Sequence, residues 1–106
     1  MTRAADEEER TMHRITEAFS KYDDEFLRFE RIEAPLHFRP DVCAFLMLDQ
    51  IAPSKRDIVS SAEHDEIWLS VDVEKVSENA TDEQLRDLHR CGVRFDEENE
   101  SLCMFV

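Results

Sequence analysis

The sequence predicts an α+β domain in which helices cover one face of a small three-stranded, mostly antiparallel sheet. Apolar residues repeat at helical spacing through the first third of the chain, and a second apolar segment follows Pro40. Segment 66–106 instead alternates short β-branched or aromatic runs with helix-capping signals. With 106 residues, three Pro and one Gly, the chain fits a single domain over 1–106 that is rich in helix.

The clearest periodic signal is a seam of apolar side chains spaced alternately three and four residues apart. This spacing predicts one long amphipathic helix over residues 6 to about 33, or two helices in phase, ended by Pro35. Asp23 and Asp24 mark a place where the helix can break, because Asp side chains compete with helical hydrogen bonds. The seam consists of Met12, Ile15, Phe19, Tyr22, Phe26 and Phe29.

The seam is also a candidate interface. Heptad spacing is typical of coiled coils, but the flanking e and g positions carry Asp and Glu without any Lys or Arg. A parallel homodimer would bring like charges together, so we expect the seam to pack on its own domain or on a partner with basic edges. Homo-oligomerisation or docking through the seam is the alternative, in which the chain is a structural or assembly protein.

A second helix is predicted over residues 40–52. Pro40 suits the first turn of a helix, and Asp41 lies near its positive end. Apolar residues occupy positions 42–48 and Ile51, and so surround nearly the whole circumference. Such a helix is expected to be buried in the middle of the domain.

The segment 66–106 predicts the order β-α-α-β-β. Residues 66–71 are rich in β-branched and aromatic side chains, and Asp72 can cap the short helix that follows. Thr81 and Gln84 form a capping box for the next helix, and Gly92 ends that helix in a left-handed cap. Residues 93–96 and 102–106 flank an acidic turn and read as a β-hairpin.

The charge balance limits the classes of partner. Twenty-six Asp and Glu against 13 Lys and Arg give a formal charge of −13, which disfavours direct binding of nucleic acid or anionic membranes. The charge fits a protein partner with a basic surface, mimicry of a nucleic acid, or solubility alone. The residues proposed for partner binding are Asp72, Glu74, Glu78, Asp82, Glu83, Asp96, Glu97, Glu98 and Glu100.

The sequence also predicts a cytoplasmic location. The three cysteines are odd in number and lack a CxxC spacing, which is typical of thiols in a reducing compartment. The N-terminal residues have no apolar stretch typical of a secretory signal. The longest apolar run, residues 42–48, is too short to span a bilayer.

No motif for catalysis, cofactor binding or metal binding is recognised, so we expect a protein that is not an enzyme and has no cofactor. The GxGxxG, GxxxxGK[ST], GxSxG and HExxH patterns are all missing from the sequence. His64 beside Asp65 could supply a general base or a metal ligand, and a metal-dependent enzyme that uses these residues and His89 is a further alternative. Ser60 and Glu63 there also fit a capping box. The remaining combination is His89 with Cys91 and Cys103, which falls short of the four ligands that zinc prefers.

The C-terminal half resembles small acidic proteins of unassigned function from bacteriophage and prophage genomes. The resemblance is carried by residues 62–72, 90–96 and 102–106 and includes no catalytic motif. It implies a phage setting, in which small acidic proteins often bind and disable host nucleases or polymerases. The sequence therefore predicts a non-enzymatic acidic protein-binding module, acting as a phage-type modulator or inhibitor of a basic, nucleic-acid-binding host protein.

Overall fold

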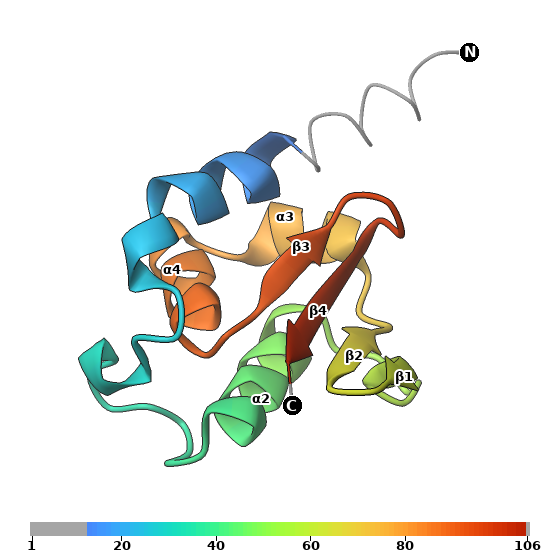
Figure 1. The fold of residues 1–106 in the computed structure, drawn as a ribbon, viewed down its shortest axis with the longest axis horizontal. Coiled ribbons are helices and arrows are strands. Elements are labelled where there is room, and N and C mark those ends of the chain that lie inside the picture. Colours follow the sequence, from blue (N-terminus) through green and yellow to red (C-terminus); the bar gives the residue numbers. More distant parts are fainter. Residues whose placement is uncertain (1–12, 106) are drawn as a thin grey trace.

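The computed structural model describes residues 13–105 and has an α+β fold. Figure 1 shows the helix of residues 13–21 and the following turns on one side, and the β1–β2 hairpin on the other. The β3–β4 hairpin crosses the middle of this view, with α3 behind it, α4 beside it toward the turns that follow the first helix, and α2 below.

The first helix is shorter than the sequence predicted. Residues 13–21 are helical, and the chain then forms two 3-10 turns, η1 (Asp23–Glu25) and η2 (Phe29–Arg31). The break expected near Asp23 is confirmed, but the predicted α-helix from there to residue 33 is wrong. Leu27 adopts a left-handed φ of 64°, which a right-handed helix cannot contain. Residues 6–12 of the predicted helix lie outside the described residues.

The second predicted helix is confirmed as α2 (Pro40–Ile51), with Pro in its first turn. Its apolar residues do not all lie inside the domain, however. Cys43, Met47 and Leu48 are buried on one face, whereas Leu46 is 41 % exposed. The helix therefore packs by one side against α3 and α4 and does not occupy the middle of the domain.

The sheet has four antiparallel strands in the order β1-β2-β4-β3, where the sequence predicted three. The strands are β1 (Val59–Glu63), β2 (Glu66–Leu69), β3 (Arg94–Asp96) and β4 (Ser101–Phe105). The additional strand, β1, was not predicted, because the sequence of this segment also fitted a capped turn at Ser60 and Glu63. It is exposed along its whole length and forms a sheet edge, so its sequence shows no alternation of buried and exposed residues.

The two faces of the sheet differ in character. Ile67 lies opposite Met104, and Phe95 lies opposite Leu102, so these side chains share the face that packs on the helices. Trp68 and Arg94 both lie opposite Cys103 on the other face. That outer face is not part of the main core, as is common for antiparallel sheets.

The helices after β2 confirm the predicted β-α-α-β-β order. α3 (Val73–Asn79) is capped by Asp72, whose carboxylate accepts hydrogen bonds from the backbone N–H groups of Glu74 and Lys75. α4 (Asp82–Arg90) begins with the predicted capping box of Thr81 and Gln84. Gly92 follows α4 with a φ of 102°, as the left-handed cap requires.

The core joins the first helix to α4. Ile15 and Phe19 are buried, and the Phe19 ring stacks on the imidazole of His89 with the ring centroids 4.7 Å apart. Arg14 strengthens this contact, because its guanidinium donates hydrogen bonds to the carbonyls of Ser77 and Ala80 at the end of α3. The helix of residues 13–21 therefore packs on the rest of the domain through both apolar contacts and hydrogen bonds.

Candidate functional site

The acidic residues proposed for partner binding separate into two groups. One group lies on α3 and the start of α4, where Asp72 caps a helix and Asp82 forms an ion pair with Lys21 at 3.4 Å. The carboxylates of Glu78 and Glu83 are exposed there. The other group is residues 96–100, which connect β3 to β4 and which we term the acidic turn.

Asp96 holds the acidic turn in a defined shape. Its carboxylate accepts hydrogen bonds from the indole N–H of Trp68 at 2.9 Å and from the side-chain amide of Asn99 at 2.7 Å. The backbone N–H groups of Glu98 and Asn99 also donate to Asp96. The hydrogen bonds from Asn99 and Trp68 lower the pKa of Asp96 below its usual value of 3.8, so the carboxylate stays ionised.

The other three carboxylates of the turn point to solvent. Glu97, Glu98 and Glu100 are exposed, and within residues 13–105 none of them has an ion pair or a side-chain hydrogen bond. Because Asp96 restrains the backbone between them, these charges are presented together on a structured loop.

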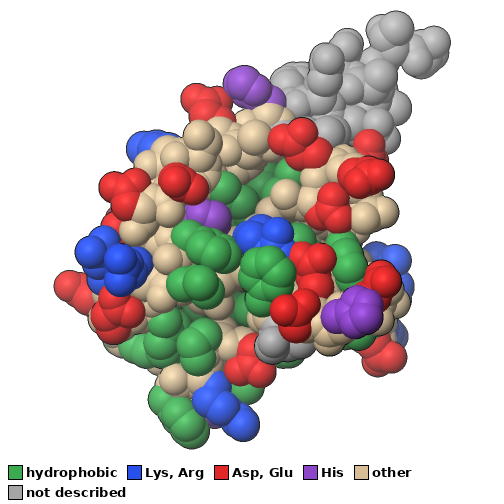
Figure 2. All heavy atoms as spheres, in the orientation of Figure 1, with side chains coloured by type: hydrophobic (Ala, Val, Ile, Leu, Met, Phe, Trp, Pro, Cys, Tyr) green, Lys and Arg blue, Asp and Glu red, His purple; other side chains and the backbone are tan. Residues whose placement is uncertain are grey.

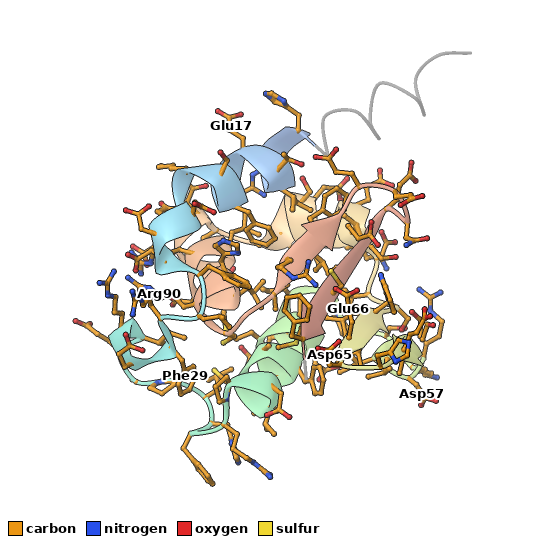
Figure 3. All side chains as sticks on the ribbon, in the orientation of Figure 1. Glu17, Phe29, Asp57, Asp65, Glu66 and Arg90 are labelled. Carbon is orange, nitrogen blue, oxygen red and sulfur yellow. The ribbon has the colours of Figure 1, made fainter. Side chains whose placement is uncertain are left out.

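The arginines near the sheet and α4 are used inside the domain. Arg94 pairs with Glu66 across β4, and its guanidinium lies 4.0 Å from the ring centroid of Phe105. Arg90 bridges Glu25 of η1 at 2.7 Å and Asp87 of its own helix at 3.0 Å. Figure 3 shows Arg90 directed toward the η1–η2 segment and Glu66 beside β4. These cations are therefore not available to neutralise the acidic turn.

A groove of about 370 Å³ lies beside the acidic turn, which we term the Trp68 groove. Trp68 is half-buried, and its indole N–H bond to Asp96 fixes the orientation of the ring. The groove lies between β1 and the β3–β4 connection, on the outer face of the sheet. Its lining residues are Ser60, Ser61, Glu63, Trp68, Asn99 and Ser101.

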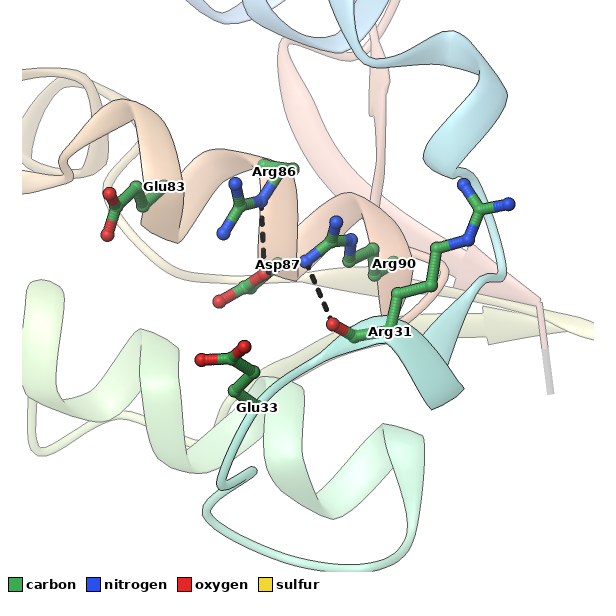
Figure 4. A pocket seen from close by; sticks show the side chains of 6 residues that line it. All are labelled: Arg31, Glu33, Glu83, Arg86, Asp87 and Arg90. Atoms are coloured by element: carbon green, nitrogen blue, oxygen red, sulfur yellow. Dashed lines mark hydrogen bonds and ion pairs between the residues drawn. The ribbon is translucent and has the colours of Figure 1, made fainter.

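A second cavity, of about 460 Å³, lies between α4 and the segment that follows η2. Figure 4 shows its three arginines, Arg31, Arg86 and Arg90, beside three carboxylates. Two of the arginines pair with Asp87, and Arg90 also donates to the carbonyl of Arg31 at 3.3 Å. The positive and negative side chains around this cavity form a network of ion pairs and hydrogen bonds that links α4 to η2. The carboxylates in this network would repel an anionic ligand.

The predicted chemical candidates near His64 lie in a surface turn. His64 and Asp65 are the two exposed residues that connect β1 to β2, and His64 adopts a φ of 55°. The capping box expected from Ser60 and Glu63 is wrong, because both residues belong to β1. Neither side chain of the turn has a hydrogen-bond partner within the described residues, so no catalytic arrangement of His64 and Asp65 is formed there.

The other candidate set, His89, Cys91 and Cys103, is divided by the fold. Nδ1 of His89 lies 2.9 Å from the carbonyl oxygen of Val93, and within the described part of the chain its buried Nε2 has no partner. Burial raises the pKa of the Cys91 thiol, and a contact with Cys43 raises it further. Cys103 lies on the outer face of the sheet, and burial raises its pKa as well. Protonated, buried thiols are poor nucleophiles.

No group of three or more His, Cys, Asp or Glu side chains suited to a metal ion is found among residues 13–105.

The seam packs mainly inside the domain. Of its six residues, Ile15 and Phe19 are buried, Tyr22, Phe26 and Phe29 are half-buried, and Met12 lies outside the described residues. Phe26 lies 5.0 Å from the His89 ring between centroids. If the buried part of the seam formed an interface with another chain, the helix of residues 13–21 would have to dissociate from α4.

Apolar side chains are nevertheless exposed on one face of the molecule. Figure 2 shows them gathered in the middle of this face, next to acidic and basic groups. The described residues with the largest exposed apolar side chains include Leu27 at 59 %, Phe38 at 78 % and Phe105 at 52 %. His37 stacks on Phe38 and Arg94 lies over the ring of Phe105, but large parts of these apolar side chains stay exposed.

The Trp68 groove was not predicted from the sequence. The available signal was Trp68 itself, the only Trp in the chain, which lies in the predicted strand between Ile67 and Leu69, two apolar residues that alternate onto one face. That alternation places Trp68 on the outer face. The partners from β1 and the acidic turn could not be recognised, because β1 was not expected to be a strand.

Comparisons with known proteins do not place the chain in a family. No family model matches it, and neither the curated proteins nor the solved structures give a match. Within residues 13–105, no helix has the length and apolar character needed to cross a membrane. The interpretation of the site therefore rests on its own geometry and charge.

Proposed function

We propose that the chain is a non-enzymatic acidic protein-binding module that acts as a modulator or inhibitor of a basic, nucleic-acid-binding host protein, of the kind found in phages. The observation that carries the proposal is the acidic turn. Its exposed carboxylates Glu97, Glu98 and Glu100 are presented on a loop that Asp96 restrains, without ion pairs among residues 13–105.

Electrostatics favours a basic partner over other ligands. The chain carries a formal charge of −13, which raises the rate and affinity of encounter with a basic surface and opposes binding to phosphate groups. Regularly presented carboxylates can take the place of phosphates in a nucleic-acid-binding groove. The partner would then be a basic protein of the host cytoplasm.

The test is an affinity capture from bacterial lysate with three forms of the full chain. The wild type is compared with Glu97→Gln/Glu98→Gln/Glu100→Gln and with the control Asp24→Asn/Glu30→Gln/Asp49→Asn. The control removes the same number of exposed charges far along the chain from the acidic turn. Circular dichroism checks that all three forms fold.

We expect one basic protein that is retained by the wild type and the control, lost from the turn variant, and released by salt. Salt should release it because exposed charges are screened within about 10 Å at 0.1 M salt. A mimic of nucleic acid predicts, in addition, that duplex DNA displaces the partner. Equal retention by the turn variant would show that the acidic turn is not the contact. If the wild type retains no protein at all, the proposal of a modulator is contradicted.

A further inference from the structure

Several hydrogen-bond donors in the Trp68 groove are already used within the domain, whereas acceptors there stay available to a ligand. Trp68 Nε1 and Asn99 Nδ2 already donate to Asp96, at 2.9 and 2.7 Å. The Ser60 hydroxyl donates to the carbonyl of Trp68 at 3.2 Å, and the Ser101 hydroxyl donates to the carbonyl of Asn99 at 3.1 Å. Four donors of the groove are thus engaged within the domain.

The acceptors of the same residues are left for a ligand. A hydroxyl that donates its proton keeps two lone pairs, and an amide whose N–H₂ donates keeps its carbonyl oxygen. Glu63 is exposed in the groove, and its carboxylate has no ion pair among residues 13–105. The groove therefore offers oxygen acceptors and one negative charge, and its lining includes no Lys or Arg.

The indole of Trp68 adds a flat aromatic wall. Trp is the strongest of the aromatic side chains in binding a cation over its ring face. The bond from Nε1 to Asp96 holds the ring in place before any ligand arrives. A ligand suited to this groove is positively charged, flat and rich in donors, which describes the guanidinium of arginine better than the compact ammonium of lysine.

From this arrangement we propose that the Trp68 groove binds an arginine side chain of the basic protein partner. This inference rests on the proposed function and adds an anchor to it: the acidic turn attracts the basic surface, and the groove seats one guanidinium against Trp68. The oxygens of Ser60, Ser101 and Asn99 accept from its N–H groups, and Glu63 balances its charge.

The test uses Trp68 as its own reporter, because it is the only tryptophan of the chain. The full chain is titrated with acetylated, amidated tri-arginine, tri-lysine and tri-citrulline while its fluorescence is followed. Citrulline has nearly the shape of arginine but carries no charge. Isothermal titration calorimetry measures total binding in parallel.

We expect a saturable change in Trp68 emission with tri-arginine, a weaker response with tri-lysine and none with tri-citrulline. Glu63→Gln should weaken tri-arginine binding by about 3–10-fold, in the range expected for an exposed charge pair beside an aromatic ring. Its matched control, Glu30→Gln in η2, should leave the affinity unchanged, because Glu30 is an exposed carboxylate that does not line the groove.

The outcomes separate the two proposals. If tri-arginine binds by calorimetry and binding depends on Glu97, Glu98 and Glu100 but neither moves Trp68 emission nor responds to Glu63→Gln, the groove inference is overturned and the acidic turn stands. An equal response to tri-citrulline would also overturn it. If the lysate capture yields no partner while tri-arginine still binds at Trp68, the failure lies with the modulator and not with the groove.

Discussion

At the residue scale, we expect the stability of the domain to depend on the carboxylate of Asp96 and on the backbone φ of His64, one in each β-hairpin. Asp96 joins β3, β2 and the acidic turn through one carboxylate, and His64 adopts a backbone angle that favours glycine. Both side chains can be changed with little alteration of the core, so their effects can be measured in isolation.

Asp96→Asn is expected to lower stability at neutral pH and to flatten its dependence on pH in the acid range. Because the folded state lowers the pKa of Asp96, this carboxylate stabilises the fold above its usual value of 3.8. That contribution is lost as the pH falls below 3.8 through the lower folded pKa. Urea unfolding of wild type and variant from pH 7 to pH 2 measures the difference. A constant difference over this range would show that the charge of Asp96 is not what stabilises the turn.

His64→Gly is expected to stabilise the domain by about 0.5–1 kcal/mol, because glycine adopts a positive φ without the steric cost that a Cβ brings. His64 is exposed at a φ of 55°, so no core contact is lost. Its neighbour Asp65 has no positive φ, and Asp65→Gly should destabilise the same turn. Thermal unfolding of both variants tests the pair, and equal shifts would contradict the expectation.

At the scale of elements, the domain depends on how the first helix docks on α4. Phe19 stacks on His89, and Arg14 donates to the carbonyl groups at the end of α3. Leu27 continues the contact, because its backbone N–H donates to the carbonyl of His89 at 3.3 Å. This docking occupies the face that a coiled coil or an assembly interface would use.

Phe19→Ala is expected to cost about 3–5 kcal/mol of unfolding free energy, as is usual when a buried aromatic is truncated. Phe19→Asp should unfold the domain, since it would bury a carboxylate against His89 and Phe26. Circular dichroism and size-exclusion chromatography with light scattering distinguish the outcomes. A folded monomer from Phe19→Asp, where the wild type is an oligomer, would instead support assembly through the seam.

At the scale of the whole molecule, net charge opposes compaction. Several arginines form ion pairs inside the domain, so the excess of carboxylates faces outward. The resulting self-repulsion is long-ranged in low salt and is screened within about 10 Å at 0.1 M. The same charge that would attract a basic partner thus weakens the isolated domain.

Stability is therefore expected to rise with salt between 0.02 and 0.2 M NaCl, with each 1 kcal/mol gained raising Tm by about 4–8 °C. The variant Asp24→Asn/Glu30→Gln/Asp49→Asn carries less negative charge and should depend less on salt. Differential scanning calorimetry of both forms checks this. A Tm that falls with salt would show that attractive pairs such as Arg90–Glu25 outweigh the repulsion.

The sequence by itself determined the features that depend on neighbours within a few residues. Pro40 begins α2, Asp72 caps α3, the Thr81–Gln84 box begins α4 and Gly92 ends it, all as predicted. The hairpin around the acidic turn was also recognised, because strand propensity and turn chemistry are local. The acidic residues were located in the same way, since their positions and charges are read directly.

Only the tertiary structure decided the features that depend on partners distant in sequence. β1 has no buried face and exists as a strand because β2 supplies its hydrogen bonds. After the predicted break, the 3-10 turn η1 is held by Glu25, whose carboxylate accepts a hydrogen bond from Arg90, 65 residues away. The Trp68 groove likewise joins residues 60–68 to Asn99 and Ser101. Local periodicity could not indicate such contacts, because they form only when strands and helices from separate parts of the chain come together.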